Sequence, residues 1–196
     1  MRADAQRNYD RLLDEARQAF VAHGTDVALE DIARQAEVGV GTLYRHFPDR
    51  YALMNAVFEQ EMDALTARGH GLLSEDDPAA ALAKWLRAVA VHSTTYRGLA
   101  AAIMEASDAK MPACRTKMPA AGRSLLGRAQ QAGTVRTDVT IGDLLKLTYA
   151  IVVSAERNTE DAGLFDRLMS LMIEGMLTRG KGDPVAPPPV TAGRRA

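Results

Sequence analysis

The chain has 196 residues, of which 47% are hydrophobic and 25% charged, and its formal net charge is −1. This length suits one or two small domains and allows a substantial hydrophobic core. No apolar run approaches the roughly 20 residues that span a bilayer, and residues 1–10 lack the apolar region of a signal peptide. Cys114 is the single cysteine, which excludes an intramolecular disulfide and a multi-thiolate metal centre. We expect a cytoplasmic protein without a membrane segment.

Apolar residues recur at helical spacing along most of the chain, and helix-breaking residues separate the periodic stretches. The first stretch ends at Gly24, and two short stretches follow over 29–36 and 40–47. A longer helix is predicted to open at residues 48–49 and to fade near residues 69–71. Nothing in this half of the chain is typical of a β-strand.

The middle of the chain contains further helix boundaries. Asp77 is placed to cap a helix whose first residue is Pro78 and which reaches about Tyr96. A shorter helix is predicted over residues 99–108.

Two prolines, Pro112 and Pro119, are predicted to bracket a break before a helix that ends at Gly133. Residues 134–140 are expected to form a loop.

Two strongly apolar helices, 141–156 and 163–179, complete the predicted fold, which is all-α with about nine helices. We expect a domain of residues 1–50, a helical domain of residues 51–180 and a proline-rich disordered tail over 181–196.

The second and third helices form the most informative pattern. Two helices of about seven residues, joined by residues 37–39, have the form of a helix-turn-helix, in which the second helix enters the DNA major groove. If Leu43 and Phe47 face the core, a rotation of about 100° per residue turns a small, polar and cationic face outward. That face carries Gly41, Thr42, Tyr44 and Arg45.

Around these residues the sequence resembles the tetracycline-repressor (TetR) family of transcriptional regulators. The similarity runs over residues 12–57 and is strongest in GTLYRHF, residues 41–47, followed by Arg50 and Leu53. The resemblance implies that four residues contact DNA, mostly at phosphates: Thr42, Tyr44, His46 and Arg50. It also implies that three variable positions help to select the operator: Val40, Gly41 and Arg45. The helical wheel alone places His46 nearer to the core.

The chain departs from the family pattern at three positions. Ala28 stands where many members have a capping Ser or Thr, and we expect Asp26 to substitute imperfectly. Glu37 replaces a turn glycine, and a left-handed backbone there costs a non-glycine residue roughly 1 kcal/mol. Gly39 replaces a capping serine. Residues 1–50 carry seven arginines against nine carboxylates, so the basic charge must be concentrated locally.

The last two helices are predicted to form a homodimer. Both 141–156 and 163–179 are apolar over more than one face, so each must bury a second surface. Residues 132–147 also resemble the loop and helix start found in many TetR members. Packing within the monomer core is the alternative.

The resemblance implies a ligand pocket within residues 78–133, opposite the dimer helices. Candidate lining residues, chosen for apolar or adaptable side chains, are Trp85, His92, Tyr96, Met104, Met111, Cys114, Met118 and Tyr149. Ordinary core packing is the alternative for each. A redox-sensor role for Cys114 is disfavoured, because the sequence contains no second cysteine that could form a disulfide with it.

No enzyme motif is recognisable. The four histidines form no HExxH pair, and there is no glycine-rich phosphate loop or GxSxG elbow. We therefore expect no catalytic site, metal or cofactor.

These patterns predict a homodimeric repressor that binds a palindromic operator in double-stranded DNA and is released by a small-molecule effector. An activator or a corepressor-dependent regulator is possible on the same evidence. A helical ligand-binding or adaptor protein with weak or lost DNA binding is the second hypothesis, and a helical enzyme is the third.

Overall fold

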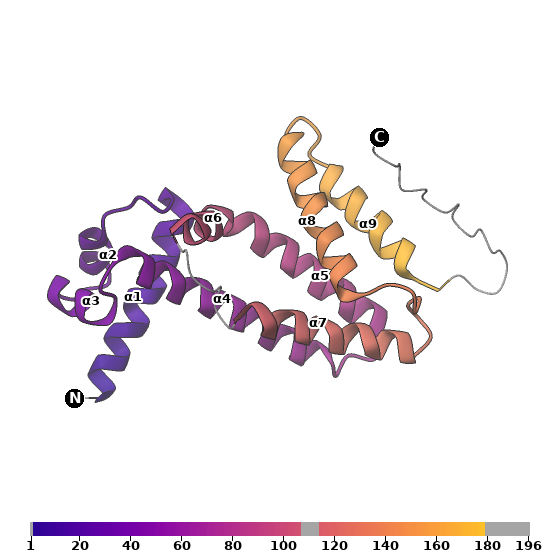
Figure 1. Cartoon of the computed structure of the whole chain (residues 1–196), viewed down its shortest axis with the longest axis horizontal. Helices are drawn as coiled ribbons and strands as arrows, with labels where there is room; N and C mark the ends of the chain where they lie inside the picture. The colour runs from indigo at the N-terminus through magenta and orange to yellow at the C-terminus, as the bar shows by residue number, and fades with distance from the viewer. Residues whose placement is uncertain (1, 107–113, 179–196) are drawn as a thin grey trace, which may run out of the picture.

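The computed structural model describes residues 2–106 and 114–178, which form nine α-helices and no sheet (Figure 1). The prediction of an all-α fold with about nine helices is confirmed. The helices are α1 (Arg2–His23), α2 (Leu29–Gln35), α3 (Val40–His46), α4 (Arg50–Leu72), α5 (Pro78–Thr95), α6 (Arg97–Ala106), α7 (Cys114–Gln131), α8 (Ile141–Arg157) and α9 (Leu164–Met176). None of these helices combines the length and hydropathy that crossing a membrane requires.

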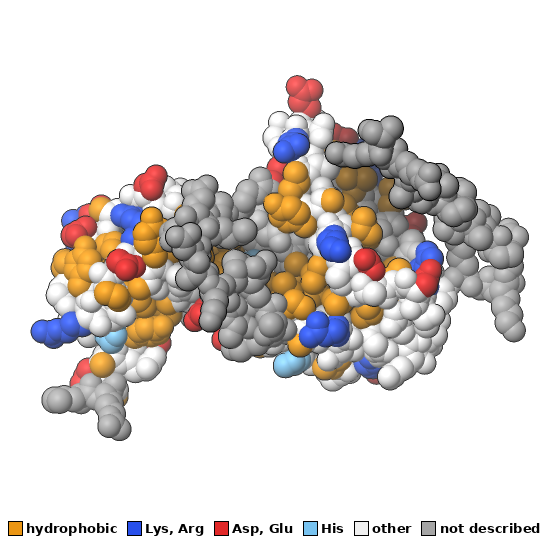
Figure 2. Space-filling model, viewed as in Figure 1, with side chains coloured by type: hydrophobic (Ala, Val, Ile, Leu, Met, Phe, Trp, Pro, Cys, Tyr) orange, Lys and Arg blue, Asp and Glu red, His pale blue; other side chains and the backbone are white. Residues whose placement is uncertain are grey.

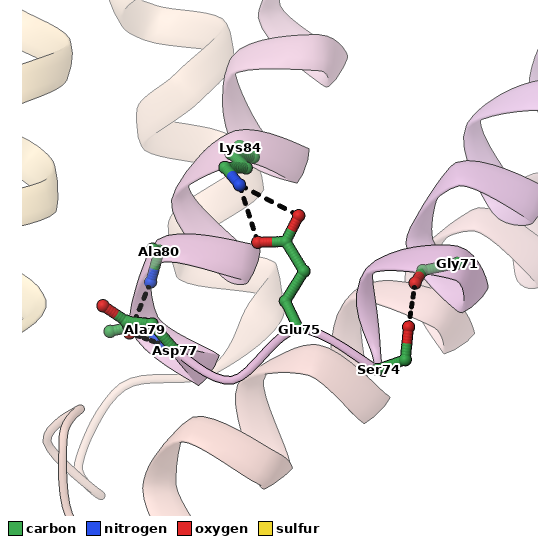
Figure 3. A network of polar contacts seen from close by, with 7 residues as sticks. All are labelled: Gly71, Ser74, Glu75, Asp77, Ala79, Ala80 and Lys84. Atoms are coloured by element: carbon green, nitrogen blue, oxygen red, sulfur yellow. Dashed lines mark hydrogen bonds and ion pairs between the residues drawn. The ribbon is translucent and has the colours of Figure 1, made fainter.

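The start of α5 follows the predicted capping pattern (Figure 3). Pro78 is in the first turn, and the Asp77 carboxylate accepts hydrogen bonds from the backbone N–H groups of Ala79 and Ala80, both at 3.0 Å. These bonds satisfy two donors that have no partner within the helix.

The structure corrects the prediction for Pro119. It lies inside α7 and does not mark a break before it. In the second turn of a helix, proline removes one backbone donor. The buried contacts of Leu125, Leu126 and Ala129 further along α7 offset this loss. Pro112 lies outside the described residues.

The end of α9 is earlier than predicted. The helix stops at Met176 instead of residue 179, because the following backbone pairs with the 134–140 loop. Arg136 N–H donates to the Met176 carbonyl at 3.0 Å, and Thr178 N–H donates to the Thr134 carbonyl at 3.1 Å. The expected tail, 181–196, lies outside the described residues.

The buried side chains form two clusters, and α4 contributes to both. Leu53, Met54 and Val57 pack with α1, α2 and α3, whereas Met62 and Leu65 pack with α5, α7, α8 and α9. Figure 1 shows α4 running from the group of α1, α2 and α3 into the larger helical group. The expected division after residue 50 stays a prediction, but α4 joins the two cores.

Helix α6 and the residue before it belong to the first of these cores. Tyr96, Leu99 and Ile103 are buried with the side chains of α1–α3, although they follow α5 in the chain. The end of α5 is therefore attached to the N-terminal core.

Candidate nucleic-acid interface and regulatory cavity

Helix α3 is held in place by its apolar side. Leu43 and Phe47 are buried in the N-terminal core. The Tyr9 ring from α1 packs against Phe47, with ring centroids 5.1 Å apart, and meets His46 edge-on at 5.6 Å. These contacts fix which face of α3 points outward.

The turn between α2 and α3 requires an unusual backbone at Glu37. Its φ is 55°, the only positive φ of a non-glycine residue in the described part of the chain. Behind it, Val38 N–H donates to the Ala33 carbonyl at 2.9 Å and closes the end of α2. The left-handed conformation expected for this position is therefore present, although Glu37 has replaced glycine.

The two short helices begin without side-chain caps. Ala28 and Gly39 are the N-cap residues of α2 and α3, and neither offers a capping oxygen from a side chain. Asp26 forms no hydrogen bond with the start of α2 in the structure, so the expectation that it substitutes for the cap is wrong. At these two positions only the backbone carbonyls of Ala28 and Gly39 accept hydrogen bonds, from N–H groups in the first turns of α2 and α3.

The outward face of α3 is open and carries one free cation. A Cβ on Gly41 would meet nothing within 4 Å, so this part of the helix can approach another molecule closely. Arg45 is exposed and has no ion-pair partner among the described residues. Val40 and Tyr44 are exposed beside them, and Thr42 is half-buried.

Tyr44 is already hydrogen-bonded within the protein. Its hydroxyl donates to the Glu30 carboxylate of α2 at 3.0 Å, and this bond raises the pKa of Tyr44. Glu30 therefore places a negative charge beside the face that the sequence assigns to DNA.

Arg50, at the start of α4, points inward to the loop between α1 and α2. Its Nη1 donates to the backbone carbonyls of Thr25 and Val27, the latter at 2.6 Å. The guanidinium thus anchors that loop.

A cavity of about 800 Å³ lies between α4 and α5. The predicted pocket residues His92 and Tyr96 line it, together with Leu65 and Ala88. The pocket was expected within residues 78–133, so the contribution of α4 was not predicted.

Three of the other predicted pocket residues, Trp85, Met118 and Tyr149, do not line this cavity. Trp85 is buried in the core, where its Nε1 donates to the Leu65 carbonyl at 3.0 Å. Tyr149 is 58% exposed on α8, beside a separate hollow. Met118 packs against the larger core. Met111 lies outside the described residues, and the side chains of Met104 and Cys114 are not described.

Three cations and one carboxylate border the cavity. The Lys84 ammonium is held by both Glu75 oxygens, at 2.7 and 2.9 Å (Figure 3). Arg87 pairs with Asp166 of α9 at 3.1 Å. Arg68 is exposed and has no partner among the residues that the structure describes.

His92 is one of the uncharged polar residues that line the cavity. Its ring lies 4.7 Å from the Tyr96 ring and 6.1 Å from the Phe58 ring. Burial lowers the pKa of His92 to about 4, and its Nε2 is buried without a hydrogen-bond partner among the described residues. His92 is therefore neutral at pH 7.

The same end of the cavity touches the N-terminal core. The Arg17 guanidinium of α1 lies 3.8 Å from the Glu61 carboxylate of α4, and Glu61 lines the cavity. Tyr96 interacts with both side chains, and burial, reinforced by Glu61, raises the pKa of its hydroxyl. One small cluster thus joins α1, α4 and the end of α5.

Helices α8 and α9 expose apolar side chains. Leu147, Tyr149 and Leu171 are 51%, 58% and 64% exposed. Figure 2 shows apolar side chains on the part of the surface that α8 and α9 occupy in Figure 1. These residues are on the helices predicted to bury a second face.

Comparison with known proteins agrees with this arrangement. Residues 12–57 match the tetR family of bacterial regulatory proteins, and residues 77–178 match the C-terminal domain of SbtR-like transcriptional regulators. The chain belongs to the TetR family of transcriptional regulators. The family resemblance drawn from the sequence is therefore confirmed, and the chain is a helix-turn-helix DNA-binding regulator of a non-enzymatic family.

Two solved TetR structures cover nearly the whole fold. A TetR transcriptional regulator from Streptomyces coelicolor is 33% identical, with a TM-score of 0.73 over 87% of this chain and 99% of that one. A TetR regulatory protein from Mycobacterium vanbaalenii is 31% identical, with a TM-score of 0.70 over 90% and 99%.

Curated relatives match a limited stretch of the chain. An HTH-type transcriptional regulator of Staphylococcus aureus is 36% identical over 64 residues, which is 32% of this chain. The match spans 35% of that protein's length. The chain thus spans about a third of the length of these curated relatives.

Several residues of these sites were not predicted from the sequence. Glu30 was counted only as part of the acidic balance, and its proximity to Tyr44 depends on how α2 crosses α3. Arg68, Lys84 and Arg87 are at helical spacings typical of a solvated face. Only the pairing of α4 with α5 brings them to one cavity.

Proposed function

We propose that this TetR regulator is a cytoplasmic homodimeric repressor that binds a palindromic operator and leaves it when a small-molecule effector binds. The observation that carries the proposal is the outward face of α3, where Gly41 leaves open space and Arg45 is unpaired among the described residues. A small residue allows the helix backbone to approach the major groove closely. A free guanidinium can donate hydrogen bonds to a guanine base or to a phosphate.

The proposed DNA contacts fall into two groups. Val40, Gly41 and Arg45 face the bases. The phosphate contacts come from Thr42, Tyr44, His46 and Arg50. Among these, His46 is half-buried against Tyr9, which orients its ring at the edge of the interface.

Dimerisation through α8 and α9 is supported by their exposed apolar side chains, Leu147 and Leu171 above all. Two copies related by a twofold axis would present two α3 helices to successive major grooves, about 34–36 Å apart.

The cluster of Arg17, Glu61 and Tyr96 supports coupling between effector and DNA. It lies where the cavity meets the N-terminal core, so a ligand that displaces Tyr96 or Glu61 also disturbs the contact with α1. An effector that favours the non-binding conformation by a typical coupling of about 1–3 kcal/mol releases the operator.

Fluorescence anisotropy tests the DNA-binding assignment. The first duplex is the region upstream of the gene for this chain, with a scrambled duplex as reference and salt varied throughout. We expect T42A/Y44F to weaken specific binding at least about tenfold, since it removes phosphate contacts from both half-sites. The control S124A changes an exposed α7 residue and should bind as the parent does. Unchanged binding by T42A/Y44F contradicts the assignment of α3.

Sedimentation equilibrium tests the dimer. L171E places a charge on the apolar face of α9 and should shift the protein to monomer. V21E makes the same change on α1, at a valine that is 49% exposed, and should leave the dimer intact. A dimeric L171E protein contradicts the proposed interface.

A further inference from the structure

The cavity between α4 and α5 has the size and lining of a site for an organic ligand. Its volume of about 800 Å³ lies within the range of small-molecule sites, roughly 300–1,000 Å³. Ala64, Leu65, Ala88 and Val91 give it an apolar surface shared by the two helices. The ligand must therefore have an apolar body.

Among the described residues, the charged side chains that line the cavity include one positive charge without a counter-charge. Lys84 and Arg87 are neutralised by Glu75 and Asp166, neither of which lines the cavity.

The Glu61 carboxylate faces the Arg17 guanidinium at 3.8 Å. Arg68 alone lines the cavity with no partner in the described part of the chain. A ligand with a single negative charge matches this balance better than a cation or a dianion.

The two ends of the cavity differ in polarity. Helices α4 and α5 follow each other through a short turn (Figure 1). Arg68 is in the last two turns of α4 and Lys84 in the first two turns of α5, whereas His92 and Tyr96 are at the other end of α5, which joins the N-terminal core. His92 is neutral at pH 7 because its burial lowers its pKa to about 4. The Glu61 carboxylate lines this same end and would repel the negative charge of a ligand, so the anionic group of a ligand is favoured at the opposite end, beside Arg68.

We propose that this cavity binds an organic monoanion with an apolar body, with its carboxylate at Arg68 and its apolar body directed towards His92 and Tyr96. The proposal rests on the proposed effector-responsive function, because it names the chemical class of the effector. It also gives the ligand a direction, with its apolar end next to the Arg17–Glu61 contact.

Calorimetric titration of the full chain, without DNA, tests the site with three probes that share one apolar chain. Decanoate is the anion, decanol the neutral analogue and decylammonium the cation, all below their micellar concentrations. We expect decanoate to bind at least about tenfold more tightly than the other two, in line with a charge-assisted hydrogen bond to Arg68. Equal binding of decanol or decylammonium overturns the proposal.

Two pairs of variants locate the site. R68Q should weaken decanoate binding about tenfold, whereas R123Q, at an exposed arginine of α7 outside the cavity, should not. A64W should fill the cavity and abolish binding, whereas A67W, at an exposed alanine of the same helix that does not line it, should bind as before. Circular dichroism verifies that each variant is folded. Decanoate binding that R68Q and A64W leave unchanged overturns the site.

The DNA assay is performed separately, so that the two proposals can fail independently. Decanoate that binds through Arg68 without changing operator affinity supports this site and contradicts the effector step of the proposed function. A chain that binds operator but shows no decanoate binding overturns the site and leaves the DNA-binding assignment standing.

Discussion

The hydroxyl of Tyr44 on α3 donates a 3.0 Å hydrogen bond to the carboxylate of Glu30 on α2. Tyr44 cannot donate the same proton to a DNA phosphate while this bond is present. Glu30 is also exposed beside the proposed DNA-binding face of α3, where its negative charge would oppose the approach of phosphates. We therefore expect this pair to lower the DNA affinity of residues 1–50, which already contain more carboxylates than arginines.

We predict that E30Q binds operator DNA more tightly, by about three- to tenfold at moderate salt, because an uncharged amide no longer repels phosphates. Anisotropy titrations of parent and variant across salt measure the change, and the gain should shrink as salt rises. E160Q, in the loop before α9, removes one charge far from α3 and is the control. Weaker binding by E30Q would show that Glu30 assists the interface.

The sequence predicted most of the helix-turn-helix, since its evidence is local. The spacing of Leu43 and Phe47 orients α3, and the turn at residues 37–39 separates two short helices. The capping of α5 by Asp77 is equally local. Such features depend on neighbours within a few residues, so periodicity and residue type are sufficient to find them.

The cavity required contacts between distant segments, which periodicity does not provide. Trp85 was a reasonable pocket candidate by residue type, but Gly69 and Gly122 make room for its ring in the core. Arg68 was overlooked because a charged residue on a helix is usually solvated. Whether a side chain meets a cavity or a core depends on which helices pack together.

The backbone at Glu37 gives a second prediction. Its φ of 55° disfavours any residue with a Cβ, so E37G should raise the free energy of unfolding by up to about 1 kcal/mol. Urea denaturation measures the difference. E37A removes the exposed contact with Arg11, 3.8 Å away, but keeps the backbone strain, and it should not stabilise the protein. Equal stabilisation by both variants would assign the effect to charge.

Gly122 gives a third prediction, because it packs directly against Trp85. A Cβ at this position would lie 2.5 Å from the indole ring and 2.9 Å from Ile141, so G122A should lower the free energy of unfolding by about 1–3 kcal/mol. G127A, in the same helix with nothing within 4 Å, should raise it by up to about 1 kcal/mol through helix propensity. Urea denaturation of both variants compares steric and propensity effects, and a stabilising G122A would contradict the tight packing at Trp85.

His92 gives the fourth prediction, a dependence of stability on pH. Burial lowers its pKa from 6.5 to about 4 in the folded protein, so between these values the unfolded chain binds the extra proton. Stability therefore falls as pH falls through this window, and the His92 contribution is constant above it. Linkage gives a loss of about 2 kcal/mol from this group between pH 7 and pH 5.

Urea denaturation of the parent and of H92F at both pH values isolates this contribution. Phenylalanine retains ring packing with Phe58 and Tyr96 but does not titrate, so H92F should lose about 2 kcal/mol less than the parent on acidification. H70Q replaces an exposed histidine of α4 and should follow the parent. If H92F and the parent lose the same stability, His92 is protonated in the folded protein without penalty, and the end of the cavity next to the DNA-binding core is charged at acidic pH.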